Sequence, residues 1–453
     1  MNKPAPGSPR ELLNLAYPLI LSTASATIMQ FVNRVFLSRY SSDALAACVP
    51  AGILAFSFGC FFMGTASYTN AFVAQYHGRK LPSKVTLSLW QGVWLSLLAW
   101  ILLLFLTPAG LWIINASGHA PSVKILEERY FLILNCGGGL SILNAALAAF
   151  FVGRSKTKVT MLVNIASNLL NVLLTWLLVF GVGPLPELGI EGAAYSFLAG
   201  QTAMALAYIT LILTPKNRKK YRTLQLARLD RPLFLRLLKY GMPNGIGFML
   251  DVASFTVFIF LVGNMDKISL AANNVIASIN SLAFMPVIGL GMATLTLTGQ
   301  YIGARKREVA ETVAYTGMKI AVSYALTLSL IFVLFPHALV DMFGQPNSPD
   351  YAAILEASRS LMKMLAVFIL FDAVGIIFGD ALRGAGDTRF QMTVALVCAW
   401  LIFVPGIYYL THAGHASLQV IWWWAAFYVS ALAAVLWMRI RSGKWLETDI
   451  LKR

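Results

Sequence analysis

The 453-residue chain is too apolar for an ordinary soluble protein: 58% of its residues are hydrophobic and 12% are charged, against about a quarter charged in soluble domains. Its net charge of +16 comes from basic residues in short segments between apolar runs, which indicates membrane topology and excludes nucleic-acid binding as the main role. The four cysteines lie inside apolar runs and the five histidines are scattered, so neither a disulfide framework nor a zinc site is predicted.

Twelve apolar runs are long enough to cross a bilayer, since a helical span needs about 20 residues. The sequence therefore predicts an all-α membrane protein with twelve transmembrane helices. In chain order the predicted spans lie near residues 12–36, 44–76, 86–107, 126–152, 159–182, 189–214, 238–263, 270–302, 310–336, 352–382, 390–411 and 417–438.

The basic residues are distributed unevenly between the two sides of these spans. With twelve spans, 27 of the 35 lysines and arginines fall on the side of the N-terminus, among them the run KNRKKYR at 216–222. Cytoplasmic loops carry the excess of Lys and Arg. We therefore expect a multi-pass protein of the inner (plasma) membrane with both termini in the cytoplasm.

The two halves of the chain resemble each other. A shift of 225 residues aligns 12–80 with 237–305 without a gap, with 12 identities in 69 positions that cluster at span starts and ends. The charged segment 216–236 separates six spans on each side, which predicts an N-terminal lobe (1–215), a basic cytoplasmic linker (216–236) and a C-terminal lobe (237–453). An even number of spans per lobe predicts two six-helix bundles related by a pseudo-twofold axis along the membrane normal, with a site between them.

Two aspartates, Asp251 and Asp372, lie near the middle of the seventh and tenth spans. A carboxylate at that depth costs about 2.5–3.5 kcal/mol on insertion scales, so such residues usually face a cavity, a partner or an ion path. Both are candidate sites for a coupling cation, and Na⁺ would make them metal ligands; the alternative is a structural acid bonded to a neighbouring helix. Asp380 lies near the cytoplasmic end of the tenth span, where pairing with Arg383 is the favoured interpretation.

Amide side chains form a second set of candidates. Asn164, Asn168 and Asn171 are spaced to share one face of the fifth span, where they could bind substrate or join helices by interhelical hydrogen bonds. The same two interpretations apply to the other amides in the spans: Gln30, Asn33, Asn273 and Asn274.

No catalytic motif is present: the sequence has no GxSxG, no HExxH and no phosphate loop ending in GK[ST]. An enzyme is therefore not predicted, and no cofactor is expected beyond a coupling ion. A duplicated bundle with acids at mid-depth favours a transporter over a receptor without transport activity.

Several motifs resemble those of multidrug and toxic compound extrusion (MATE) transporters, in their NorM-like branch. The matching segments include LAYPLILSTASATIMQFVNRVFLSR in the first span, GMPNGIGFMLDVASF in the seventh and FDAVGIIFGDALRGAGDTR around the tenth. The resemblance implies a fold of two six-helix bundles that exports cationic or amphipathic small molecules in exchange for Na⁺ or H⁺. It also implies that Asp251 and Asp372 form the cation site of the C-terminal lobe.

The chain departs from the family pattern in its N-terminal lobe. Asn33 stands where the family commonly has an aspartate, and Asn168 stands where many members have an acid. We therefore expect cation coupling in the C-terminal lobe. We also expect the protein to be a monomer embedded in the bilayer. A polyisoprenoid-lipid flippase of the same superfamily is the alternative function, although such proteins usually carry a more basic cavity.

Overall fold

The computed structural model describes residues 4–263, 265–341, 351–412, 414 and 416–451. These residues form helices and no β-strand, and twelve of the helical segments are long and apolar enough to cross a membrane. The all-α class and the twelve spans predicted from the sequence are thereby confirmed. The spans are α1 (Pro9–Tyr40), α2 (Ser42–Ser67) with α3 (Thr69–Gly78), α4 (Pro82–Ala116), α5 (Pro121–Val152), α6 (Thr157–Phe180), α7 (Gly189–Ile212), α9 (Arg231–Gly263), α10 (Lys267–Gly303), α11 (Arg307–Leu334), α13 (Tyr351–Ala385), α14 (Thr388–Ala395) with a π-helical segment (Leu396–Phe403) and α15 (Val404–His412), and α16 (Leu418–Arg441).

The chain packs as two compact units whose boundaries fall inside α1 and α9. The C-terminal unit comprises the residues up to Ile20 together with Leu250–Asp449, and the N-terminal unit comprises Leu21–Met249 together with the residues from Ile450 onward. Each of the two helices therefore contributes to both units. The lobes expected from the sequence, 1–215 and 237–453, assign each helix to only one.

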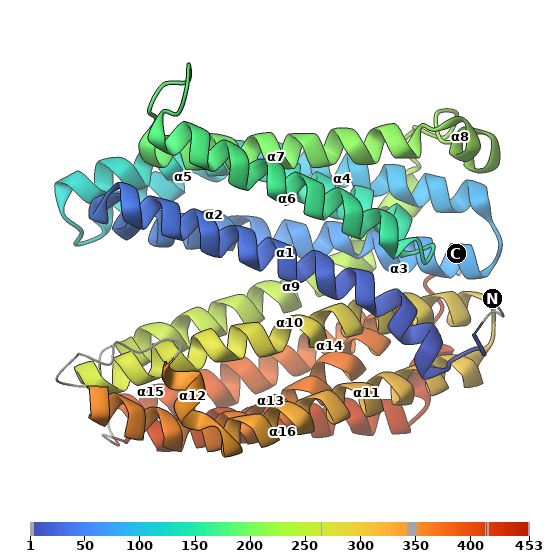
Figure 1. Cartoon of the computed structure of the whole chain (residues 1–453). Helices are drawn as coiled ribbons and strands as arrows, with labels where there is room; N and C mark the ends of the chain where they lie inside the picture. Colours follow the sequence, from blue (N-terminus) through green and yellow to red (C-terminus); the bar gives the residue numbers. More distant parts are fainter. Residues whose placement is uncertain (1–3, 264, 342–350, 413, 415, 452–453) are drawn as a thin grey trace. The chain divides into compact units, whose positions relative to one another are not determined.

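In the N-terminal unit α5 is the central helix, in contact with α2, α4 and α7. Its glycines allow close approach, since a Cβ on Gly137 would lie 2.5 Å from the Leu198 side chain of α7. The helices α6 and α7 lie side by side in the same unit (Figure 1). The glycines of 137–139 thus serve helix packing.

In the C-terminal unit α13 is the central helix, in contact with α10, α11 and α16 (Figure 1). The span α14–α15 contains a π-helical segment that ends just before Pro405. Proline has no N–H to continue the helical ladder, and the wider π turn before it accommodates that loss. The Phe403 carbonyl at this point accepts a hydrogen bond from Trp424 Nε1 at 3.2 Å.

Helix occupies both ends of the basic connector 216–236. The connector contains the short helix α8 (Pro215–Tyr221), and α9 begins at Arg231 because Asp230 caps it: the Leu233 amide donates to Asp230 Oδ1 at 3.0 Å. Gln91 of α4 holds the segment in place, since its amide donates to the Arg228 carbonyl and its Oε1 accepts from the Asp230 amide.

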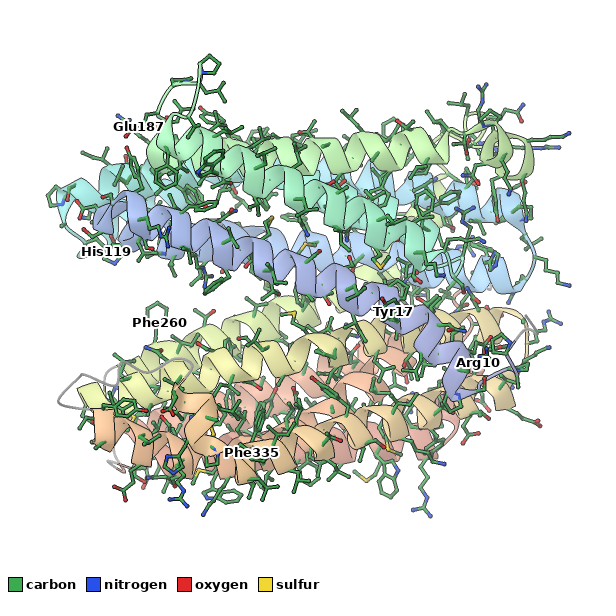
Figure 2. The ribbon with its side chains drawn as sticks, viewed as in Figure 1. Arg10, Tyr17, His119, Glu187, Phe260 and Phe335 are labelled. Atoms are coloured by element: carbon green, nitrogen blue, oxygen red, sulfur yellow. The ribbon has the colours of Figure 1, made fainter. Side chains whose placement is uncertain are left out.

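Large apolar side chains stand out from the surface along the spans, as Figure 2 shows for Tyr17, Phe260 and Phe335. Phe260 is 72% exposed and Phe335 58% exposed. Such exposure would be a liability in water and is expected of side chains that face lipid.

Candidate functional site

The two candidate acids come from α9 and α13 and lie together in the C-terminal unit. Asp251 is exposed and Asp372 is half-buried, and the two carboxyl groups are close enough for their charges to interact. Tyr428 of α16 lies within electrostatic reach of both. Two carboxyl groups and one phenol from three helices therefore form one polar group within the C-terminal unit's spans, at its surface. Like charges brought together in this way favour the binding of a cation or a proton.

Aromatic side chains pack beside this polar group. Tyr428 stacks on Phe403 with ring centroids 4.5 Å apart, and Phe403 in turn stacks on Phe258 of α9 at 6.1 Å. Phe258 meets the edge of Trp422, whose indole N–H donates to Asn273 Oδ1 at 3.1 Å. Asn273 is therefore a buried partner of α16, whereas Asn274, the next residue of α10, is exposed.

Asp380 is placed differently from the other two acids. It is buried, its Oδ1 lies 3.4 Å from Arg383 Nε one turn further along α13, and its other oxygen packs against Gly291 of α10. The carboxylate already has a cationic partner on its own helix. This geometry supports the pairing that the sequence favoured over a role in cation binding.

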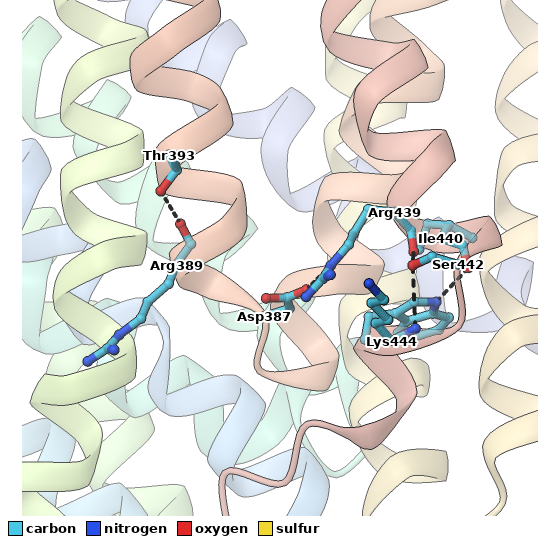
Figure 3. Close-up of polar contacts among 8 residues, drawn as sticks. Asp387, Arg389, Thr393, Arg439, Ile440, Ser442 and Lys444 are labelled. Atoms are coloured by element: carbon cyan, nitrogen blue, oxygen red, sulfur yellow. Dashed lines mark hydrogen bonds and ion pairs between the residues drawn. The ribbon is translucent and has the colours of Figure 1, made fainter.

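The glycine-rich RGAGD stretch that follows is a packing device. A Cβ on Gly384 would meet the Leu295 carbonyl of α10, and Gly386 has φ +111°, which side-chain-bearing residues rarely adopt. Asp387 then accepts a hydrogen bond from Arg439 Nε of α16 at 2.7 Å (Figure 3). The stretch thus ties the end of α13 to the end of α16, and its glycines are explained without a phosphate ligand.

In the N-terminal unit the amides of α6 all face α1. Asn164 donates to Ser22 Oγ at 2.5 Å, and Asn168 donates to Ser25 Oγ at 2.9 Å. One turn further on, the Asn33 amide donates to Asn171 Oδ1 at 2.9 Å. The shared face predicted from the spacing is present, and its hydrogen bonds join two helices.

A pocket of about 410 Å³ opens beside this polar face, between α1, α2, α5 and α7 of the N-terminal unit. Gln30 and Asn33 line it, as does Arg34, while Asn164, Asn168 and Asn171 do not. Asn33 Oδ1 and Asn171 Nδ2 are buried and have no hydrogen-bond partner within the described residues. The Asn33–Asn171 pair beside the pocket therefore has one acceptor and one donor that could still form hydrogen bonds.

The sequence analysis missed two residues of interest. Tyr428 carried no signal, because it is one of sixteen tyrosines and only folding brings α16 to the acids. Glu127 was overlooked at the edge of the fourth predicted span. It is 1% exposed, two turns into α5, and its Oε1 lies 2.8 Å from His119 Nδ1. Its burial with a histidine partner was not visible from spacing.

The acids do not form a multi-ligand metal centre of their own. Within the described residues no three His, Cys, Asp or Glu side chains gather at one point. A Na⁺ ion at Asp251 and Asp372 would need further oxygen ligands from hydroxyl, amide or backbone groups, and these suit a hard cation.

Fold and site together define a helical membrane protein with two units, paired acids in the spans of one and an amide-lined pocket in the other. The sequence profile of the MatE family matches residues 18–177 and 243–409. The chain belongs to the MatE family, as the resemblance of its motifs predicted, and is therefore a MATE-type transporter.

Known proteins similar to the chain agree with this family. The "Probable multidrug resistance protein NorM" of Rhizobium meliloti is 29% identical over 400 residues, which cover 87% of this chain and 84% of the relative. The protein of the same name from Mesorhizobium japonicum is 27% identical, with 97% and 94% covered. Among solved structures, an outward-facing multidrug resistance MATE family transporter of the MOP superfamily has a TM-score of 0.86 at 20% identity, with 96% of each chain covered.

Proposed function

We propose that the protein is a secondary antiporter that exports cationic or amphipathic compounds in exchange for Na⁺ or H⁺. The single observation that carries the proposal is the placement of Asp251 and Asp372 together, at mid-span, in a chain of the MatE family. Relatives named multidrug resistance proteins match nearly the whole chain, which supports a multidrug substrate range.

The coupling step follows from the chemistry of the side chains. A carboxylate gives up its charge when it binds a proton and has its charge offset when it binds Na⁺, so its occupancy can follow an ion gradient. An amide can do neither. We therefore assign ion coupling to Asp251 and Asp372 and substrate contact to Gln30 and Asn33, which line the pocket.

Transport in proteoliposomes tests this proposal directly. Purified protein is reconstituted, an inward-directed Na⁺ or H⁺ gradient is imposed in turn, and the movement of ethidium and of a fluoroquinolone is followed by fluorescence. We expect at least one gradient to drive transport and an ionophore that dissipates it to stop transport. Failure of both gradients to move either compound would favour a receptor without transport activity.

We further propose that one chain, lying in the inner membrane, is sufficient for transport and has both termini and the connector 216–236 in the cytoplasm. The support is the excess of basic residues on that side. In a cysteine-free background, Ser117→Cys and Lys219→Cys are treated in intact cells with an impermeant thiol reagent. We expect position 117 to react and position 219 to stay silent; the reverse pattern would overturn the orientation.

A further inference from the structure

The pocket in the N-terminal unit has an unexpected polarity. Its described lining contains one charged side chain, Arg34 of α1, and no aspartate or glutamate. Gln30, Asn33 and Tyr130 add uncharged polar groups, and Phe56 and Phe197 stand among its apolar lining residues. A site of this composition repels a simple cation and attracts an anionic group.

Arg34 makes no ion pair within the described part of the chain. Arg34 lies within electrostatic reach of the Cys48 thiol of α2 and the Tyr130 phenol of α5, and both residues line the same pocket. Glu127, the buried acid on α5, is engaged by His119 at 2.8 Å, and Glu191 at the start of α7 pairs with Arg129 at 2.9 Å. The guanidinium is therefore available to a ligand.

The position of Arg34 along its helix makes this availability informative. It lies six residues before the end of α1 at Tyr40, or roughly 9 Å of helix, and within the last turn of the predicted first span, 12–36. Charged residues within a span are costly and usually serve a cavity, a partner or a substrate. An arginine that only reached the membrane surface would be the plain alternative.

We propose that this pocket binds amphipathic molecules that carry a carboxylate, held by the Arg34 guanidinium, with the aromatic body against Phe56 and Phe197. The planar guanidinium presents paired N–H donors that match a carboxylate. The volume of about 410 Å³ is that of a small-molecule site. As a statement about transport, this proposal rests on the proposed function. Among amphipathic substrates, the pocket would select zwitterions and anions over simple cations.

A matched pair of dyes tests the proposal. Rhodamine 110 carries a free carboxylate, and rhodamine 123 is its methyl ester, so the two differ only in the group that Arg34 would recognise. Binding of each to the purified protein in detergent is measured by fluorescence polarisation. We expect the free acid to bind about tenfold more tightly than the ester, as a charge-assisted hydrogen bond in a partly open site would give.

Variants then assign the preference to Arg34. Arg34→Gln should bring the two dissociation constants together, and Arg34→Lys, which keeps the charge without the paired donors, should retain part of the difference. Arg39→Gln is the matched control, because Arg39 lies in the last turn of the same helix, is exposed and does not line the pocket. It should leave the ratio unchanged.

Three outcomes would overturn the proposal. They are equal or tighter binding of the ester by the unmodified protein, no binding of either dye, and a ratio that Arg34→Gln leaves intact. The last would mean that Arg34 only extends toward the membrane surface. Because binding in detergent needs no gradient, a preference for the acid without gradient-driven transport would support this pocket and contradict the antiport function instead.

Discussion

The two units repeat one plan of helices but differ in the polar groups inside their spans. In the C-terminal unit α9 and α13 carry Asp251 and Asp372, which interact with each other. In the N-terminal unit the amides of α6 bond to α1, and the acids within helices lie near helix starts: Asp43 and Glu191 in first turns, and Glu127 and Glu128 within the first eight residues of α5, where Glu127 pairs with His119. Only the C-terminal unit carries acids near the middle of its spans, so we assign ion coupling to that unit and substrate contact to the other.

The packing contacts repeat where the polar groups do not. A Cβ on Gly64 of α2 would lie 2.9 Å from Gly245 Cα. At the matching positions, 225 residues on and back, a Cβ on Gly289 would lie 2.8 Å from the backbone nitrogen of Ile20. The duplication therefore preserves the helix crossings. Another matched pair has partners of opposite charge: Tyr301 donates a hydrogen bond to Glu11, whereas Tyr76 lies within electrostatic reach of Arg236.

Neutralising Asp251 or Asp372 should produce the largest effect on export. If it has no effect, the proposed difference between the two units is wrong. Asp372→Asn and Asp251→Asn should each lower gradient-driven export by about tenfold or more, because an amide cannot exchange charge with an ion. The double variant should be little worse than either single one, since the two groups act together. Export of a fluoroquinolone, which carries a carboxylate, is measured in cells beside the amount of protein in the membrane.

Asp266→Asn is the matched control for these variants. Asp266 precedes α10 in the same unit, and the hydrogen bond from the Ser269 amide lowers the pKa of its carboxyl group, so it is charged at neutral pH. Asparagine still caps the helix, so export should not change. Normal export by Asp251→Asn or Asp372→Asn would contradict the two-acid site.

The repeated helix crossing predicts a loss of stability that is equal in the two units and smaller than the effect of neutralising the acids. Gly64→Ala and Gly289→Ala should each destabilise the protein by about 1–3 kcal/mol, because the added methyl group meets backbone that cannot move aside. Gly59→Ala is the control, since nothing lies within 4 Å of its Cβ position. Thermal unfolding in detergent measures all three, and a neutral Gly289→Ala would show that the crossings are not equivalent.

The matched tyrosines should give the smallest effect. Tyr301→Phe removes the hydrogen bonds to Glu11, at 2.8 and 2.9 Å, and should cost about 0.5–1.5 kcal/mol, because both side chains are half-buried and water can replace the bonds. Tyr76→Phe removes the hydroxyl group that lies within electrostatic reach of Arg236 and should cost a similar amount. The melting temperatures of the two variants compare these contacts. No change for either variant would show that neither tyrosine hydroxyl contributes to stability.

The sequence predicted what depends on local periodicity and bulk composition. The twelve spans follow from apolar run length, and the shared face of Asn164, Asn168 and Asn171 follows from helical spacing. Side-chain partners did not follow, because Tyr428 reaches the acids only through the packing of α16, and Ser22 and Ser25 bond to α6 across 142 and 143 positions. The start of α9 also depends on a cap at Asp230, which could not be recognised among the many charged residues of the connector.

The polarity of the pocket was equally hidden in the sequence. Arg34 stands beside Asn33 in the first span, but only the packing of α2, α5 and α7 shows that no aspartate or glutamate among the described residues lines its pocket. A single basic residue near the end of a span is ordinary. Its meaning appears only when the four helices are assembled.

The separation of coupling from substrate contact is tested most directly by comparing Asn33→Ala with Asp372→Asn in proteoliposomes. Dye transport is measured while a Na⁺ gradient and a pH gradient are imposed in turn. We predict that Asn33→Ala alters which dyes move, or their apparent affinity, and keeps the response to the driving gradient, whereas Asp372→Asn loses that response for every dye. Loss of the response to both gradients in Asn33→Ala, with the response retained in Asp372→Asn, would contradict the assignment of the two units.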